Sequence, residues 1–433
     1  MATRIAAPSI VPSIPADHPT GTRPTLPVNR PILPRCPEID CVRHLLPPGI
    51  IAFAELHAAE IGVGADRVLI THGLVDEAIY INELARELGC TVEPFDNETR
   101  EACSLSEDQM IERARTGMLP LNGVDGDELV VALQETTART LKAVCHQQFD
   151  LAPRIRLTSC DELGRFVAQH ASPTIGYKAA EKLRSERPEL SAATHQGRSI
   201  ATAVIVAAIA VFALVAPGNV ALAIDIALGI VFLAWTALRL LSTFSHRPVM
   251  QVRHFGPDAT LPVYTIIVAL YREAAAVEGL IDALRRLNYP LEKIDLKLVL
   301  EPDDRTTRAA LADLRLSAPV EIIIAPDSGP RTKPKALNAA LPFARGKFIA
   351  VYDAEDRPEP DQLRLALETF TAVDHRLACV QARLTIDNTS DSWLTRLFTA
   401  EYAGLFDVFL PGLAAWRLPL PLGGSSNHFR GIR

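Results

Sequence analysis

Three clusters of polar residues in the second half of the chain could hold a cation or a nucleotide. Each cluster follows a short apolar run that predicts a buried strand; they are Tyr271-Arg272-Glu273, Glu301-Pro302-Asp303-Asp304 and Asp353-Ala354-Glu355-Asp356. Neighbouring carboxylates repel each other unless a cation or a hydrogen-bond donor lies between them. A hard divalent cation binds oxygen ligands, often one or two carboxylates together with substrate phosphates. Asp353 and Glu355 are therefore the candidate metal ligands.

A basic loop lies between the second and third of these clusters. Arg331, Lys333 and Lys335 lead into a helix that is predicted to begin near Lys335. Cations beside a helix N-terminus favour an anionic ligand such as a diphosphate. Each feature also has an ordinary structural interpretation, because acidic loop ends often cap helices and basic loops are often solvated surface. The sequence leaves both interpretations open for Asp303-Asp304 and for this loop.

Strands and helices alternate through this half of the chain. The predicted strands are 263–270, 296–300, 320–324, 348–352 and 377–382, and the predicted helices are 274–287, 308–316, 335–344 and 361–373. Such alternation is typical of a mostly parallel, doubly wound sheet. Ligands of these sheets bind at the carboxyl ends of the strands, where the polar clusters fall. No Gly-x-Gly-x-x-Gly follows the first strand, which argues against a nicotinamide-binding domain.

Two apolar segments in the middle of the chain predict a transmembrane hairpin over residues 198–245. Residues 199–216 carry no charge, and residues 220–238 carry only Asp225, which is expected near the outer headgroups. Pro217-Gly218-Asn219 is the predicted turn. Basic residues flank the hairpin on both sides and are absent from the turn, so both flanks are expected in the cytosol. They are Lys178, Lys182, Arg184, Arg187, Arg198, Arg239, Arg247 and Arg253. A buried helical hairpin of a soluble protein is the alternative.

The remaining segments are a leader and a small domain. Residues 1–45 are rich in Pro, Thr and Ala and predict a disordered leader. Residues 46–190 predict a small cytosolic α+β domain, with Asp76 as an N-cap and Gly89 at the end of its helix. The net charge of -7 argues against a nucleic-acid partner. The seven cysteines lack ligand spacing and are expected to be reduced thiols.

From Val263 onward, the chain resembles family 2 glycosyltransferases with the GT-A fold, of the membrane-embedded, cellulose-synthase-like kind. The matching stretches are Val268–Glu273, Leu300–Asp304, Thr332–Asn338, Asp353–Leu363 and Pro421–His428. The resemblance implies that Tyr271 and Glu273 line a nucleoside pocket and that Asp303 or Asp304 contacts the base. It also implies that Lys335 approaches the diphosphate.

The same resemblance implies the metal and acceptor residues. Asp353 and Glu355 stand where the family has Asp-x-Asp, which holds Mg²⁺ or Mn²⁺. Gly423, Gly424 and Ser425 form a turn near the acceptor. His428 is either a structural residue or a further acceptor contact.

The resemblance further implies inverting transfer of a sugar from a nucleotide-sugar, most often a UDP-sugar, to a glycan acceptor in polysaccharide synthesis at the bacterial inner membrane. Such transfer needs a general base. In the family this base belongs to a Thr-Glu-Asp motif after the Gly-Gly-Ser/Thr turn, so it is expected beyond Arg433. The alternative is a truncated or non-catalytic membrane protein that at most binds nucleotide.

Residues 46–190 resemble, more weakly, the N-terminal domain of type II secretion ATPases. Gly73-Leu74-Val75-Asp76-Glu77 and the helix after it carry this resemblance. Some members of that family bind cyclic di-GMP, so a regulatory role with this nucleotide is a further expectation. The chain has Glu60-Ile-Gly-Val-Gly-Ala65 where those members have Arg-Leu-Gly-x-x-Leu.

Overall fold

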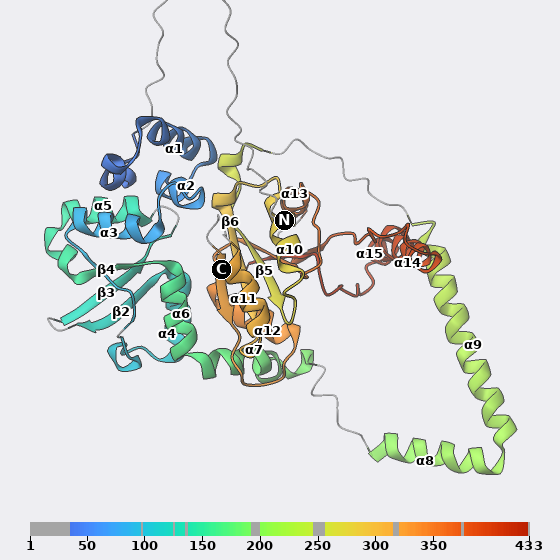
Figure 1. The fold of residues 1–433 in the computed structure, drawn as a ribbon. Coiled ribbons are helices and arrows are strands. Elements are labelled where there is room, and N and C mark those ends of the chain that lie inside the picture. The colour runs from blue at the N-terminus through green and yellow to red at the C-terminus, as the bar shows by residue number, and fades with distance from the viewer. Residues whose placement is uncertain are drawn as a thin grey trace, which may run out of the picture.

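Two β-sheets, one from each half of the chain, lie side by side (Figure 1). An arm, formed by the apolar helices α8 (Ile200–Val215) and α9 (Pro217–Ser242), projects from them. The computed structural model describes residues 35–96, 98–123, 126–134, 137–191, 200–245, 256–314, 320–373 and 376–431. The arm separates the two sheets in sequence but not in space.

The N-terminal sheet has four strands in the order β1-β4-β3-β2. Strands β2 and β3 are antiparallel, and the other pairs are parallel. Its elements are η1 Pro37–Leu45, α1 Pro48–Ile61, α2 Ala65–Thr71, α3 Glu77–Leu88, β1 Thr91–Val92, η2 Arg100–Ala102, α4 Glu107–Thr116, β2 Met118–Gly123, β3 Gly126–Ala132, α5 Thr137–Gln147, η3 Phe149–Arg154, β4 Ile155–Thr158, α6 Cys160–His170, α7 Ser172–Glu186 and η4 Pro188–Leu190. Asp76 caps α3 by accepting hydrogen bonds from the amides of Ala78 and Ile79. The predicted small α+β fold is confirmed.

The predicted leader is too long at its C-terminal end. Residues 1–34 lie outside the described residues, but Pro37–Leu45 forms the helix η1. Ile39 and Val42 of this helix are fully buried in the N-terminal core. Its buried Glu38 accepts hydrogen bonds from Arg139. Composition alone predicted disorder because the many prolines outweighed the two apolar residues Ile39 and Val42.

The C-terminal sheet has six strands in the order β7-β6-β5-β8-β10-β9. Strands β7, β6, β5 and β8 are parallel, and β10 is antiparallel to both of its neighbours. Its elements are η6 Asp258–Thr260, β5 Tyr264–Leu270, α10 Val277–Arg285, η7 Leu291–Lys293, β6 Ile294–Leu300, α11 Arg305–Asp313, β7 Val320–Ile324, α12 Lys333–Ala340, η8 Leu341–Phe343, β8 Phe348–Tyr352, α13 Gln362–Ala372, β9 Cys379–Gln381 and β10 Asn427–Arg430. The predicted mostly parallel α/β sheet is confirmed, whereas β10 was not predicted.

The N-terminal half supplies part of the cover of the C-terminal sheet. One face of this sheet packs on α10, α11 and α13. On the other face, Ile267, Val299 and Ile323 share a core with α12 and with α4, α6 and α7. A parallel sheet is stable only when both faces are covered. Residues before the arm therefore complete the core of the domain after it.

The two apolar segments form helices that differ from the predicted hairpin. They are α8, Ile200–Val215, and α9, Pro217–Ser242. Pro217 begins α9, so the predicted turn Pro217-Gly218-Asn219 is instead the first turn of the second helix, a position that proline favours. The helices meet at a corner and diverge rather than lying side by side (Figure 1). Arg198, Arg247 and Arg253, three of the flanking basic residues, lie outside the described residues.

A second apolar helical segment, which sequence reasoning missed, docks on the C-terminal end of α9. It consists of α14 Trp393–Ala403, the π-helical turn η9 Gly404–Phe409 and α15 Leu410–Ala415. Trp235 of α9 contacts Phe409, and Arg239 donates to Glu401 at 2.6 Å. Both Pro217–Ser242 and Trp393–Ala415 are long and apolar enough to cross a bilayer.

Candidate functional site

The carboxyl ends of β5 and β6 bring the first two polar clusters together. Arg272, directly after β5, has a left-handed backbone with φ of 61°. Its amide donates a hydrogen bond of 2.5 Å to Asp304, which follows β6. The amide of Glu273 donates to Thr307 Oγ1 of α11 at 3.0 Å. These bonds hold the 271–273 loop against the start of α11.

Asp304 is occupied by this structural task. Its buried carboxylate also caps α11 by accepting from the amide and the hydroxyl groups of the first turn, at Thr306 and Thr307. Burial alone would raise the pKa of Asp304, but the hydrogen bond from the Arg272 amide and those from Thr307 and Thr306 lower it to about 2. Asp304 is therefore an anion at neutral pH with its oxygens already committed.

Asp303, in contrast, faces outward with exposed partners. Its carboxylate accepts from Arg331 at 2.8 Å and from the Tyr271 hydroxyl at 3.5 Å. Arg272 lies over the Tyr271 ring, 5.0 Å from its centroid. An aromatic face, a carboxylate and two guanidinium groups thus surround one exposed surface. Of the two aspartates left open by the sequence, the structure leaves Asp303 available for a ligand.

We expect substitutions of the two aspartates to separate these tasks. Asp304→Ala should lower the free energy of unfolding by about 1–2 kcal/mol, because it removes a helix cap together with a loop contact. Asp303→Ala should leave stability unchanged and weaken UDP binding. Thermal unfolding and calorimetric titration of the two purified variants would check both statements. Equal loss of stability in both variants would contradict the division of tasks.

The basic loop approaches the third cluster through Lys333. The Lys333 ammonium contacts the Asp353 carboxylate, which follows β8, and donates to the carbonyl oxygen of Gly424 at 2.7 Å. It therefore joins the candidate metal ligand to the Gly423–Ser425 turn. The sequence analysis placed Lys333 among the basic residues expected to favour a diphosphate, but it did not predict a contact with Asp353.

Lys335 lies elsewhere than the resemblance implied. Its side chain is buried, donates to the Pro326 carbonyl oxygen at 2.7 Å and pairs with Glu301 at 3.5 Å. A buried ammonium group needs such partners, because removing it from water is costly. Lys335 therefore stabilises the loop after β7 from the protein interior. Lys333, in contrast, contacts Asp353 at the carboxyl edge of the sheet.

Asp353 and Glu355 have different surroundings. The Asp353 amide donates to Asp356 at 2.8 Å and to Ser425 Oγ at 3.2 Å, so its backbone position does not depend on its own carboxylate. Ser425 also donates to Asp356. Burial raises the pKa of Asp356, against the lowering effect of the Ser425 bond. Glu355 is exposed, and no ion pair joins it to another described residue. Asp356 is a positioning residue that the sequence did not single out.

These side chains fit a divalent cation of the Mg²⁺ or Mn²⁺ type. Asp353 and Glu355 offer carboxylate oxygens, the donor that hard cations prefer, from one short loop. The contact from Lys333 shows that the Asp353 carboxylate already faces a positive group. A cation beside Asp353 would share this carboxylate with Lys333 or displace it.

The Gly423–Ser425 turn is anchored to the sheet. Ser426 has a left-handed backbone with φ of 53°, and Asn427 donates to the Gly423 carbonyl oxygen at 2.6 Å. A Cβ at Gly423 would lie 2.5 Å from the Nε2 atom of Gln381, so a larger residue here would require the Gln381 side chain to move. His428 is buried, its Nδ1 lies 2.8 Å from the Tyr264 hydroxyl, and burial lowers its pKa to about 4. Of its two predicted roles, the structural one fits.

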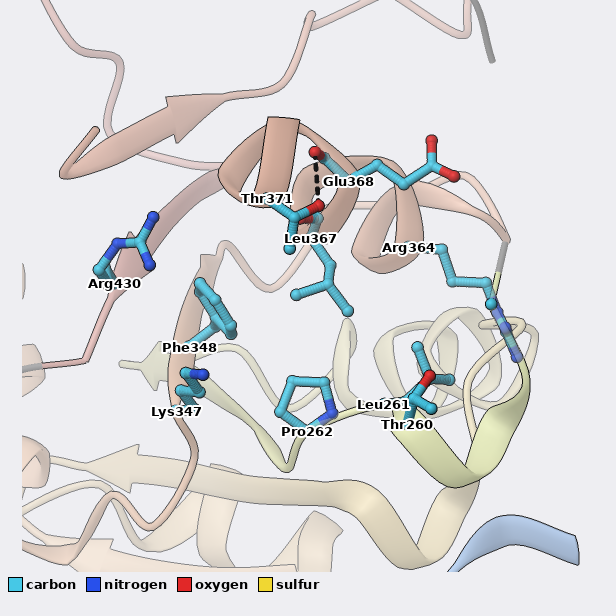
Figure 2. Close-up of a pocket in the computed structure, with 11 residues that line it drawn as sticks. Thr260, Leu261, Pro262, Lys347, Phe348, Arg364, Leu367, Glu368, Thr371 and Arg430 are labelled. Atoms are coloured by element: carbon cyan, nitrogen blue, oxygen red, sulfur yellow. Dashed lines mark hydrogen bonds between the residues drawn. The ribbon is translucent and has the colours of Figure 1, made fainter. Parts of the chain in front are cut away.

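Two cavities lined by described residues lie away from these clusters. One, of about 310 Å³, lies beside Pro262 and Phe348 at the amino ends of β5 and β8, under α13 (Figure 2). The other, of about 440 Å³, lies between the two sheets and includes Arg67, Glu321 and Arg345. The candidate site lies at the opposite, carboxyl edge of the sheet.

Comparison with known proteins agrees with this geometry. Residues 265–423 match the family model described as glycosyl transferase family 2. Beta-monoglucosyldiacylglycerol synthase of Trichormus variabilis is 27% identical over 152 residues, covering 34% of this chain and 32% of that protein. The protein of the same name from Synechocystis is 26% identical over 172 residues, covering 40% and 36%. The chain thus spans about a third of the length of these relatives.

Similar solved structures are more distant. A mannosyltransferase from Pyrobaculum calidifontis, in complex with GDP-Man and Mn²⁺, has a TM-score of 0.31 and 24% identity, covering 40% of this chain and 49% of that one. Glucosyl-3-phosphoglycerate synthase from Mycobacterium tuberculosis, in complex with UDP, has a TM-score of 0.28 and 15% identity, covering 43% and 62%.

Residues 265–423 are thus similar to glycosyltransferase family 2, and the part of the chain that contains them has an α/β fold of the GT-A type. The resemblance to family 2 glycosyltransferases, stated from the motifs, is confirmed for this region. Four of the residues that it implied lie at one edge of the sheet; they are Tyr271, Asp303, Asp353 and Gly424. Asp303 accepts from Tyr271 and Arg331. Lys333 contacts both Asp353 and Gly424.

Proposed function

We propose that the chain transfers a sugar from a UDP-sugar to an acceptor, with inversion, at this edge of the C-terminal sheet. The single observation that carries the proposal is the convergence of Asp303, Arg331, Lys333 and Asp353 there. Tyr271, Glu273 and Asp303 bind the nucleoside. Arg331 and Lys333 bind the diphosphate, because two cations in one loop match its charge.

Asp353 and Glu355 hold Mg²⁺ or Mn²⁺ in this proposal. The cation, when bound, supplies positive charge that stabilises the departing nucleoside diphosphate. Asp356 and Ser425 keep the Asp353 loop against the acceptor-side turn, so the donor and the acceptor meet at Gly423–Ser425. We assign the general base to no residue of the described chain. Binding of cyclic di-GMP to the N-terminal domain also stays a prediction.

Calorimetric titration of UDP into the detergent-solubilised chain, with and without Mn²⁺, tests this function. Saturable binding that requires Mn²⁺ is the expected result. Binding of equal affinity without a divalent cation would contradict the metal assignment, and absence of binding under both conditions would contradict the donor site. The Mn²⁺-free titration is the control in each case.

A lipid acceptor is a second candidate beside the glycan implied by the resemblance. The curated relatives are named as synthases of a glucosyl diacylglycerol. In this chain, exposed apolar side chains precede the acceptor-side turn; they are Trp393, Leu397, Phe398, Leu418, Leu420 and Leu422. Exposed apolar patches of this kind mark membrane or ligand contacts. Sugar transfer from labelled UDP-glucose to diacylglycerol vesicles, compared with transfer to soluble oligosaccharides, separates the two acceptors.

We propose that α8 and α9 both cross the bilayer. α9 has 26 residues, and its most apolar stretch of 18 residues has a mean hydropathy of 2.2 and contains no buried residue. At 1.5 Å per residue it is about 39 Å long, more than a hydrocarbon core of about 30 Å. The halves of the chain on either side of the arm share one hydrophobic core, so they lie on the same side of the membrane. That arrangement requires an even number of crossings.

This topology predicts the accessibility of the corner between the two helices. A cysteine introduced by Asn219→Cys should react with a membrane-impermeant maleimide added to intact spheroplasts. A cysteine introduced by Ser185→Cys, exposed at the end of α7, should react only after lysis. The native cysteines provide the background, measured on the unsubstituted chain. Labelling of Asn219→Cys only after lysis would contradict the predicted crossing.

A further inference from the structure

Three potential metal ligands meet where the first helices contact the C-terminal sheet. His57 lies in α1, His72 follows α2, and Glu292 lies in η7, just before β6. Their ligand atoms lie within 4.8 Å of one another. Because η7 precedes β6, this cluster lies at the amino edge of the sheet, opposite the candidate donor site. It is therefore independent of the proposed transferase chemistry.

The distances from the two histidines to Glu292 match those between the ligands of a tetrahedral zinc ion. His57 Nε2 lies 3.3 Å and His72 Nε2 lies 3.0 Å from the same oxygen, Glu292 Oε1. Nitrogen and oxygen ligands about 2.0–2.1 Å from Zn²⁺ lie about 3.3 Å apart at tetrahedral angles. Small movements of the side chains would place an ion at equal distances from all three atoms.

The charges and the ring orientations favour the same ligand. The Glu292 side chain is 1% exposed, and among the described residues its ion-pair partners are these two histidines. A buried carboxylate without a cation is costly. Phe53 stacks on the His57 ring at 5.4 Å and meets the His72 ring edge-on at 5.7 Å, which restrains both imidazoles. Glu60 lies 3.9 Å from His57 Nδ1, on the side where a zinc-bound histidine commonly finds a carboxylate.

We propose that His57, His72 and Glu292 bind one Zn²⁺ ion that fastens helices α1 and α2 to the glycosyltransferase domain. Two imidazoles and one carboxylate suit Zn²⁺ better than Mg²⁺, which prefers oxygen ligands alone. The imidazoles are 29% and 34% exposed, so a water molecule can supply the fourth ligand. The ion ties together segments that are more than 200 residues apart in sequence, and it thereby stabilises the contact between the two halves of the chain.

Zinc titration of the full chain in detergent, after removal of metal with a chelator, tests the proposal. We expect one equivalent of Zn²⁺ to bind and to raise the Tm by about 4 °C or more at saturating zinc. His72→Gln and Glu292→Gln should each remove the zinc-dependent rise. His170→Gln, which removes an imidazole from α6 instead, is the matched control and should keep it. Asp353→Asn should also keep it, because the two metal sites lie at opposite edges of the sheet.

Two results would overturn the zinc site. One is an equal zinc-dependent rise in the wild type and in the His72→Gln and Glu292→Gln variants. The other concerns the wild type alone and does not depend on folding of the variants. Co²⁺ added to the metal-free wild type should give the strong visible absorption of a tetrahedral site, and Zn²⁺ should abolish this absorption by displacing Co²⁺. Absence of the absorption would show that the histidines only form hydrogen bonds to Glu292.

Discussion

Asp353→Asn is expected to remove most of the Mn²⁺-dependent affinity for UDP while leaving the fold intact. The substitution keeps the shape of the side chain and removes its charge. The loop does not depend on that charge, because the Asp353 amide is held by Asp356 and Ser425. Affinity should fall by at least roughly 10- to 100-fold, the loss caused by removing even an outer-shell partner of a metal ligand.

Calorimetric titration at several Mn²⁺ concentrations measures this loss. Asp282→Asn is a matched control, since Asp282 lies on the exposed surface of α10, where it pairs with Arg285 at 3.6 Å. It should bind UDP as the wild type does. A variant Asp353→Asn that keeps both the affinity and its dependence on Mn²⁺ would show that the cation binds elsewhere. Unchanged Tm values for both variants would confirm that the comparison concerns binding alone.

The sequence predicted the framework of the site because its signals are local. The strand ends at Leu270, Ile324 and Tyr352 follow from apolar runs that stop at polar residues, and the observed strands end there. The positions of Asp303 and Asp353 at one sheet edge then follow from the parallel topology. The family motifs and the match over residues 265–423 describe this same region.

What the sequence could not predict depends on contacts between distant segments. The sequence did not show that Lys333, rather than Lys335, contacts Asp353. The first turn of α12 buries Lys335 against Glu301 and directs Lys333 toward Asp353. Strand β10 was missed because its pairing with β8 and β9 is antiparallel and lies more than 40 residues away in sequence. The Trp393–Ala415 segment mixes polar and apolar residues, so it showed neither a clear span nor a clear amphipathic face.

The start of β6 was predicted too late for a related reason. Asp295 precedes the apolar residues of the predicted strand, and a charged residue argues against a buried strand. In the structure Asp295 and Lys297 are both buried on the face that the N-terminal half covers. Lys297 pairs with Asp295 at 3.0 Å and with Glu321, and Arg345 pairs with the same two carboxylates. The charges compensate one another only because β6, β7 and the loop before β8 are adjacent.

This buried network is the basis of the largest expected effect on stability. Asp295 also accepts from the Thr265 hydroxyl at 2.8 Å and from the Arg345 amide at 3.0 Å, so its oxygens are fully used. Removing one member of a buried ion network leaves the others uncompensated and costs about 3–5 kcal/mol. Asp295→Ala should therefore lower the Tm by about 10 °C. Asp282→Ala, in an exposed pair, should change it by little.

The network should also make stability depend on pH in the acid range. Burial alone would raise the pKa of Asp295, but the charges of Arg345 and Lys297 hold it well below its ordinary value of 3.8. A carboxylate whose pKa is lower in the folded state contributes stability that is complete above its unfolded-state pKa and is lost as the pH falls toward the folded-state pKa. The Tm difference between wild type and Asp295→Ala should thus be largest near neutral pH and shrink below about pH 4.

Scanning calorimetry from pH 7 down to pH 3 measures this dependence, with Asp282→Ala as the flat reference. A Tm difference that stays constant over this range would show that Asp295 contributes through packing rather than through its charge. UDP affinity of Asp295→Ala below its Tm should match that of the wild type, because the network lies on the covered face and the donor residues lie at the carboxyl edge. A loss of stability without a loss of UDP affinity would show that the buried ion network stabilises the contact between the two halves and takes no part in binding the donor.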